Sequence, residues 1–140
     1  YDLVVATQDW HPATHKSFAS QHKGKKPFDV VQLNGIDQIL WPDHCVQGTF
    51  GAQLHKDLDI RPISAIFRKG MNSKIDSYSA FFDNNKLNNT GLHGFLQDKG
   101  ITELVFCGLA GDFCVAYSAN DAKVLGYKVS LFDKGIRSIN

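Results

Sequence analysis

Asp9 and His11 stand two residues apart at the end of an apolar run and are the first candidates for chemistry. On an extended backbone their side chains leave the same face of a strand, so both can approach one ion. His15 follows four residues later, and His44 lies in the stretch Trp41–Cys45. One carboxylate with two or three imidazoles suits Zn²⁺, Fe²⁺ or Mn²⁺, with zinc first, and three protein ligands leave positions open for water or substrate. We therefore predict an open metal site.

A histidine or aspartate near a strand end, taken alone, is more often a surface or capping residue than a metal ligand. Here three of the six histidines gather with an aspartate in two short stretches that also hold both tryptophans. This grouping favours the metal interpretation. His22, His55 and His93 lie in polar surroundings, and we assign them no site.

Cys114 is the candidate nucleophile. A predicted strand runs into the small-residue turn Gly108–Gly111 and then into a helix, which places Cys114 in the first helical turn. There the backbone N–H groups and the helix dipole favour a thiolate, and the amides of Ala110 and Cys114 can face an oxyanion. The alternative is that Cys114 is a buried small hydrophobe. Cys45 and Cys107 are assigned to packing, Cys107 because it lies inside a strand.

Lys69 is the third candidate, at the carboxyl end of the predicted strand Ile63–Arg68. Asp9, His11 and Cys114 are expected at the same edge of the sheet. A cation there would keep a thiolate or a carboxylate charged. The alternative is an ordinary solvent-exposed lysine.

Strands and helices alternate along the chain, which predicts an α/β fold with a mainly parallel sheet. The predicted strands are Asp2–Thr7, Ile63–Arg68, Glu103–Leu109 and Lys128–Phe132, and the predicted helices are Thr90–Lys99 and Asp112–Leu125. The strands lack clean alternation, as expected for strands covered on both faces. Gly100 and Gly126 are expected to end the helices, and Asp112 to cap the second. The long irregular stretch Pro12–Asp59 is typical of a segment that builds a site.

Composition limits the class of protein. The 140 residues are 43% hydrophobic and 21% charged with a net charge of +1, so we expect one domain over 1–140 that binds neither nucleic acid nor membrane. The basic cluster Lys23–Lys26 has no interleaved aromatics and is assigned to a solvated loop. No apolar run approaches the about 20 residues of a membrane span. Three cysteines, an odd number, favour a reducing compartment and thus the cytoplasm.

Six motifs together carry a family resemblance. They are Gln8-Asp9-Trp10-His11-Pro12, Ser17-Phe18-Ala19-Ser20, Trp41-Pro42-Asp43-His44-Cys45-Val46-Gln47, Lys69-Gly70, Asp76-Ser77-Tyr78-Ser79-Ala80-Phe81-Phe82-Asp83 and Gly108-Leu109-Ala110-Gly111-Asp112-Phe113-Cys114-Val115. This series resembles the nicotinamidases of the isochorismatase-like cysteine hydrolase superfamily and covers nearly the whole chain. The resemblance implies a three-layer αβα fold and hydrolysis of nicotinamide to nicotinate and ammonia through a cysteine thioester.

By position, the resemblance assigns a role to each candidate residue. It implies that Asp9, His11 and His44 bind one divalent metal, with His15 a ligand in some members. It implies that Cys114 is the nucleophile, Lys69 its cationic partner, and the amides of Ala110 and Cys114 the oxyanion hole, with a cis peptide often preceding Ala110. Trp41 and Tyr78 would line the pocket for the pyridine ring. The partner is then a small molecule, and a homo-oligomer is possible in this family.

The sequence departs from the family pattern in two ways. Gly111 stands where many relatives have threonine, whose side chain does not react. The catalytic aspartate of the family belongs to a first strand upstream of Tyr1, so we expect a chain that lacks this strand and the last helix and strand, and that is inactive by itself. Two alternatives stay open: another hydrolase of the superfamily, which would lack the metal, and a non-catalytic metal-binding domain, in which Cys114 would have ordinary reactivity.

Overall fold

The structure, a computed structural model, describes residues 1–140, which divide into two compact units, Tyr1–Asp76 and Ser77–Asn140. The first unit contains β1 (Val4–Asp9), the 3₁₀ turn η1 (Ala19–Gln21), β2 (Val30–Leu33), β3 (Ile36–Ile39), the 3₁₀ turn η2 (Phe50–Ala52) and β4 (Ile63–Lys69). The second contains α1 (Leu92–Asp98), β5 (Glu103–Leu109), the π-helical turn η3 (Gly111–Val115), α2 (Ala116–Val124) and β6 (Lys128–Arg137). That 1–140 form a single domain stays a prediction.

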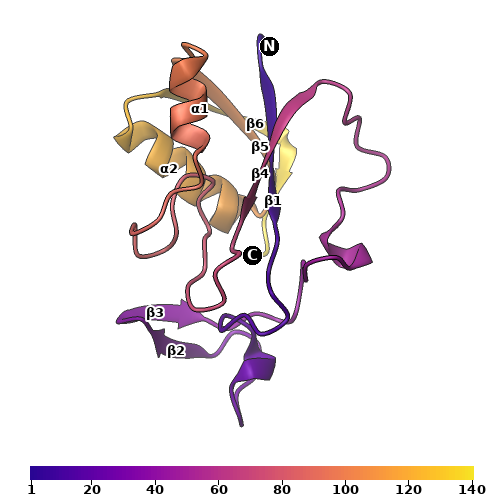
Figure 1. Ribbon diagram of the computed structural model, residues 1–140, viewed down its shortest axis with the longest axis vertical. Helices are drawn as coiled ribbons and strands as arrows, with labels where there is room; N and C mark the ends of the chain where they lie inside the picture. The colour runs from indigo at the N-terminus through magenta and orange to yellow at the C-terminus, as the bar shows by residue number, and fades with distance from the viewer. The chain divides into compact units, whose positions relative to one another are not determined.

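Each unit contains one parallel pair of strands. In the first unit β1 pairs with β4, and in the second β5 pairs with β6 (Figure 1). The register of the first pair sets Asp9 opposite Lys69, at the carboxyl ends of both strands. The α/β class and the parallel pairing predicted from the sequence are therefore confirmed.

The first unit also contains an antiparallel hairpin that the sequence analysis did not predict. β2 and β3 pair with each other inside the stretch that was expected to be irregular. Asn34 and Gly35 join them with φ values of 52° and 81°. Two consecutive positive φ values are typical of a type I′ turn, for which Asn-Gly is the preferred sequence. The expectation of an irregular Pro12–Asp59 is thus wrong over these strands.

β4 and β5 each bury one face more than the other. Burial alternates along β4 and along β5. On the outward face, Ile66 is 49% exposed, Val105 44% and Leu109 73%. β4 and β5 therefore differ from the expected strands covered on both faces, because their alternate apolar side chains contact solvent, whereas β1 shows no such alternation.

Glycines end both predicted helices. Gly100 and Gly126 follow the last turns with φ values of 67° and 93°, which side-chain-bearing residues rarely adopt. The predicted cap is wrong, because the Asp112 carboxylate accepts hydrogen bonds from the backbone N–H groups of Ile139 and Asn140, each at 3.1 Å. Those bonds, the one from Ile139 first, hold the pKa of Asp112 below its ordinary value.

No helix in the structure combines the length and hydrophobicity needed to cross a lipid bilayer.

Candidate functional site

Asp9 lies at the end of β1, where the strand register brings it beside Lys69. The Lys69 ammonium stands 2.5 Å from Asp9 Oδ1 and is almost fully buried. Burial disfavours the charged form of Asp9, but the Lys69 charge and its hydrogen bond outweigh it, so the pKa of Asp9 lies below its ordinary value. Lys69 thus keeps Asp9 ionised and is not the solvent-exposed lysine of the alternative. A pairing of Lys69 with Cys114 stays a prediction.

Backbone pairing brings His44 to His11 across 33 positions of sequence. The His11 N–H donates to the Cys45 carbonyl at 3.0 Å, and the Gln47 N–H donates to the His11 carbonyl at 2.8 Å. The rings of His11 and His44 then lie 4.9 Å apart, centroid to centroid. One ligand atom from each of Asp9, His11 and His44 falls within 4.8 Å of the others. The structure therefore brings the three predicted ligands together.

Backbone carbonyls orient both of these rings for metal binding. His11 Nδ1 donates to the Gly70 carbonyl at 2.8 Å, and His44 Nδ1 donates to the Pro42 carbonyl at 2.7 Å. A carbonyl only accepts, so each Nδ1 carries the hydrogen and each Nε2 keeps its lone pair. His11 Nε2 lies 3.9 Å from Asp9 Oδ2, a separation that two ligands at about 2.0–2.2 Å from one ion can span. The donor set therefore fits a divalent cation.

His15 is close to this group but belongs to a second one. Its ring centroid lies 4.6 Å from that of His11, and one possible ligand atom from each of His11, His15 and Asp76, all buried, lies within 4.8 Å of the others. Burial lowers the pKa of His15 to about 4, which keeps the ring neutral at pH 7. Phe18, fully buried, packs edgewise or tilted against the rings of His11, His15 and His44 at 5.5–5.7 Å.

Trp41, predicted to line a substrate pocket, is buried in the same unit. The Trp41 backbone N–H donates to the Ser17 carbonyl, and the Trp41 carbonyl accepts from the Ala19 N–H, both at 2.8 Å. Its ring packs at 5.9 Å against Phe28. These bonds tie the segment before His44 to the segment after His15.

In the second unit, Cys114 lies in the π-helical turn directly before α2 and is partly buried. The Leu109–Ala110 peptide bond is cis, as the family resemblance implied. The Ala110 carbonyl accepts from the N–H groups of Phe113 and Val115 at 3.1 and 3.0 Å, which closes the turn around Cys114. The turn is thus a π turn rather than the first turn of a regular α-helix.

Ser118 and Tyr78 support this turn. Ser118 donates to the Cys114 carbonyl at 2.6 Å and accepts from the Ala80 N–H at 2.8 Å. Tyr78 packs against Phe113 at 5.4 Å, in a T-shaped arrangement. The second unit therefore brings together three of the predicted site residues, Ala110, Cys114 and Tyr78.

The residues without an assigned site behave as ordinary structural residues. His22 Nε2 bonds the Lys16 carbonyl at 2.7 Å and His93 Nδ1 bonds the Tyr127 hydroxyl at 2.8 Å.

The assignment of Cys107 to packing is wrong, because Cys107 is exposed on the outward face of β5.

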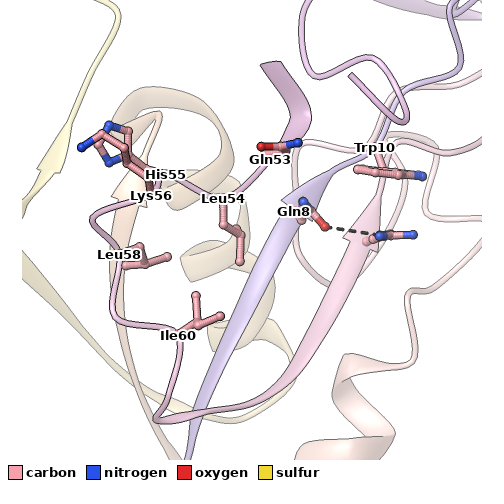
Figure 2. A pocket seen from close by; sticks show the side chains of 9 residues that line it. Gln8, Trp10, Gln53, Leu54, His55, Lys56, Leu58 and Ile60 are labelled. Atoms are coloured by element: carbon pink, nitrogen blue, oxygen red, sulfur yellow. Dashed lines mark hydrogen bonds between the residues drawn. The ribbon is translucent and has the colours of Figure 1, made fainter. Parts of the chain in front are cut away.

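A cavity of about 430 Å³ opens on the first unit beside the Trp10 ring. Figure 2 shows Gln8 and Trp10 on one side of it and Leu54, Leu58 and Ile60 on the other. The Arg68 guanidinium lies 3.8 Å from the Trp10 ring centroid and bonds Gln8 Oε1 at 3.3 Å. The lining contains none of the metal-binding candidates, so this cavity is separate from their group.

Gly70 is a residue of the site whose role the sequence analysis did not identify. Besides accepting the hydrogen bond from His11, it lies so close that an added Cβ would stand 2.3 Å from His11 Cε1. Its φ of 65° is also a glycine conformation. The Lys69-Gly70 pair was a usable signal, since a glycine directly after a candidate residue often marks close approach of the backbone.

Comparisons with known proteins agree with these motifs. Residues 4–140 match the model of the isochorismatase domain. The chain is 52% identical to the nicotinamidase of Escherichia coli (strain K12) over 139 residues, which cover 99% of this chain and 65% of that relative. The chain therefore spans less than two thirds of that relative's length.

Solved structures share the fold. A nicotinamidase/pyrazinamidase of Acinetobacter baumanii superposes with a TM-score of 0.98 at 45% identity, covering 100% of this chain and 68% of that one. A pyrazinamidase of Pyrococcus horikoshii in complex with zinc superposes with a TM-score of 0.74 at 31% identity, covering 99% and 64%. Because the family model extends over residues 4–140, this chain belongs to the isochorismatase family.

Proposed function

We propose that this chain carries the metal site and the nucleophile of an amidase that converts nicotinamide to nicotinate and ammonia. The observation that carries the proposal is the group of Asp9, His11 and His44, whose ligand atoms lie within 4.8 Å of one another. The 52% identity of the chain to a protein named nicotinamidase also supports the proposal. The substrate is thus a small aromatic amide.

In this proposal Asp9 Oδ2, His11 Nε2 and His44 Nε2 hold the metal. A carboxylate and two imidazoles suit Zn²⁺ best, although Fe²⁺ and Mn²⁺ accept the same donors. The similarity to a pyrazinamidase solved in complex with zinc supports this choice. When bound, the ion would supply a Lewis-acid position for the pyridine nitrogen or for a water molecule. Lys69 contributes by keeping Asp9 ionised.

Cys114 is the proposed nucleophile. Its place in the first turn of a helical segment favours the thiolate, which attacks the carboxamide carbon and forms a C–S bond while the carbonyl electron pair moves to oxygen. The amides of Ala110 and Cys114 would bind this oxyanion. The intermediate collapses, the C–N bond breaks and ammonia leaves with a proton from an acid. Water then cleaves the thioester to nicotinate and returns the thiol.

Other side chains would position the substrate and its protons. Trp41 and Tyr78 are the proposed walls for the pyridine ring, and Lys69 the cation that favours the Cys114 thiolate. The family resemblance assigns the acid to an aspartate upstream of Tyr1. Asp112 is a poor substitute, because its carboxylate accepts two backbone N–H groups. The odd number of cysteines, three, supports a cytoplasmic location.

Ammonia release from nicotinamide tests the proposal. In a form with the full length of the relatives we expect turnover, a loss of at least about 10³-fold in Cys114→Ala and an unchanged zinc content in that variant. Cys107→Ala is the matched control, since it removes an exposed thiol, and its rate should equal that of the parent. Zinc binding without ammonia release would contradict the proposal and favour the non-catalytic alternative. Turnover without bound metal would favour another hydrolase of the superfamily.

A further inference from the structure

His15 carries its hydrogen on the opposite nitrogen from His11 and His44. The Ser17 backbone N–H donates to His15 Nδ1 at 3.1 Å, and the Ser17 hydroxyl lies 2.8 Å from the same nitrogen. A backbone N–H only donates, so His15 Nδ1 holds a lone pair. The hydrogen of this neutral ring therefore sits on Nε2.

His15 Nε2 is a buried donor that needs an acceptor. The His15 side chain is 0% exposed, and Nε2 has no hydrogen-bond partner. Asp76, itself 3% exposed, belongs with His11 and His15 to a group whose ligand atoms lie within 4.8 Å of one another. The Asp76 carboxylate also accepts from Gln38 Nε2 at 3.5 Å. It is the charged acceptor near His15, and the backbone of Ile75 is a second, neutral acceptor beside the same ring.

The same tautomer argues against His15 as a metal ligand. Coordination through Nε2 would need the hydrogen to move to Nδ1, where it would face the Ser17 N–H. Coordination through Nδ1 would take the lone pair from that N–H and leave a buried donor unpaired, which is unfavourable. His11 offers one lone pair, at Nε2, because its Nδ1 donates to Gly70. An ion shared by His11, His15 and Asp76 would therefore compete with the group of Asp9 and His44.

We propose that His15 is a positioning residue: the nearby Asp76 charge favours the hydrogen on its Nε2, its ring supports the His11 ring, and it does not enter the coordination of the metal. The inference rests on the metal site of the proposed function. His11 is then held on two sides, by the Gly70 carbonyl at 2.8 Å and by the His15 ring with centroids 4.6 Å apart. Loss of a residue that holds a metal ligand in place typically weakens metal binding by about 10–100-fold.

Long-range ¹H–¹⁵N correlation spectra of the protein with ¹⁵N-labelled histidine read each tautomer directly. We expect His15 to keep its Nε2–H in the metal-free and the zinc-loaded protein, while the Nε2 signals of His11 and His44 shift on zinc addition. A zinc-induced shift at either His15 nitrogen like those of the two ligands, or a His15 that carries its hydrogen on Nδ1, would overturn the proposal.

Zinc affinity tests the positioning role. His15→Phe keeps a ring but removes the donor, and Asp76→Asn removes the ionic acceptor; each should raise the zinc Kd by about 10–100-fold. His15→Gln places an amide N–H near the Nε2 position and should bind zinc more tightly than His15→Phe. This difference distinguishes loss of the N–H donor from a general loss of folding, which would weaken zinc binding equally in both variants. Equal, unchanged Kd values in all three variants would overturn the role. Ammonia release is measured separately, so an inactive protein with the expected tautomers would refute the proposed function and leave this inference intact.

Discussion

Gly70→Ala should weaken metal binding although Gly70 is not a ligand. The new Cβ would stand 2.3 Å from His11 Cε1 and 2.5 Å from His11 Nδ1, closer than non-bonded carbon atoms approach. These contacts are with a fully packed ring, since His11 is 2% exposed and touches His15, Phe18 and His44. The His11 ring must therefore move, and its Nδ1–H would lose the Gly70 carbonyl.

The magnitude follows from two contributions. A left-handed backbone costs a residue with a side chain about 1–2 kcal/mol. Loss of the hydrogen bond from His11 to Gly70 lowers the free energy of unfolding further, by about 0.5–1.5 kcal/mol. Displacing a ring whose orientation fixes a ligand nitrogen should raise the zinc Kd by about 10–100-fold.

Gly24→Ala is the matched control for the backbone contribution. Gly24 has a φ of 76°, close to the 65° of Gly70, and an added Cβ there meets nothing within 4 Å. Urea unfolding should show the backbone cost alone in Gly24→Ala and a larger total cost in Gly70→Ala, which also loses the hydrogen bond of His11. Competition with a zinc indicator should show weakened binding in Gly70→Ala alone. Zinc Kd values that agree within about threefold between the two variants would refute the reasoning.

Three further predictions concern single side chains. Iodoacetamide should label the partly buried Cys114 faster than the exposed Cys107, because a thiolate reacts where a thiol does not; faster labelling of Cys107 would contradict this. Burial lowers the pKa of His15 from 6.5 to about 4 in the folded protein. Between these two pH values the unfolded chain binds a proton at this residue that the folded protein does not. The metal-free protein should therefore lose up to about 3 kcal/mol of stability as the pH falls from about 6.5 to 4. His15→Gln should flatten this profile in urea titrations, and an equal slope would contradict it. Lys69→Met should cost about 3–5 kcal/mol by removing the buried cation from the partly buried Asp9 carboxylate, against under about 1 kcal/mol for Lys86→Met, whose side chain is 52% exposed; equal costs would contradict the role of Lys69.

Local patterns predicted the parts of the fold that depend on local physics. The strand Glu103–Leu109 has the predicted bounds, and Gly100 and Gly126 end the helices as expected. The hairpin of β2 and β3 was not predicted, although Asn34-Gly35 is a strong turn signal, because it lies in a long stretch with little periodicity. A π turn at Cys114 has no distinctive local pattern, so an α-helical turn was the natural expectation.

The candidate site was predictable as a set of residues but not as a geometry. The spacing of Asp9 and His11 on one strand face placed two donors together. The approach of His44 depends on hydrogen bonds from the backbone of His11 to the segment after His44, which residue types do not reveal. The tautomers depend on distant partners as well, since the carbonyl that orients His11 is 59 residues away at Gly70.

Metal removal and return during nicotinamide hydrolysis tests the central claim most directly. The protein is stripped with a chelator, dialysed, and assayed for ammonia release before and after addition of Zn²⁺, Fe²⁺ or Mn²⁺. If Asp9, His11 and His44 hold a required ion, ammonia release should fall to background on stripping and return with one of these metals, and His44→Ala should not respond to any of them. A stripped protein that releases ammonia at the original rate would contradict the account.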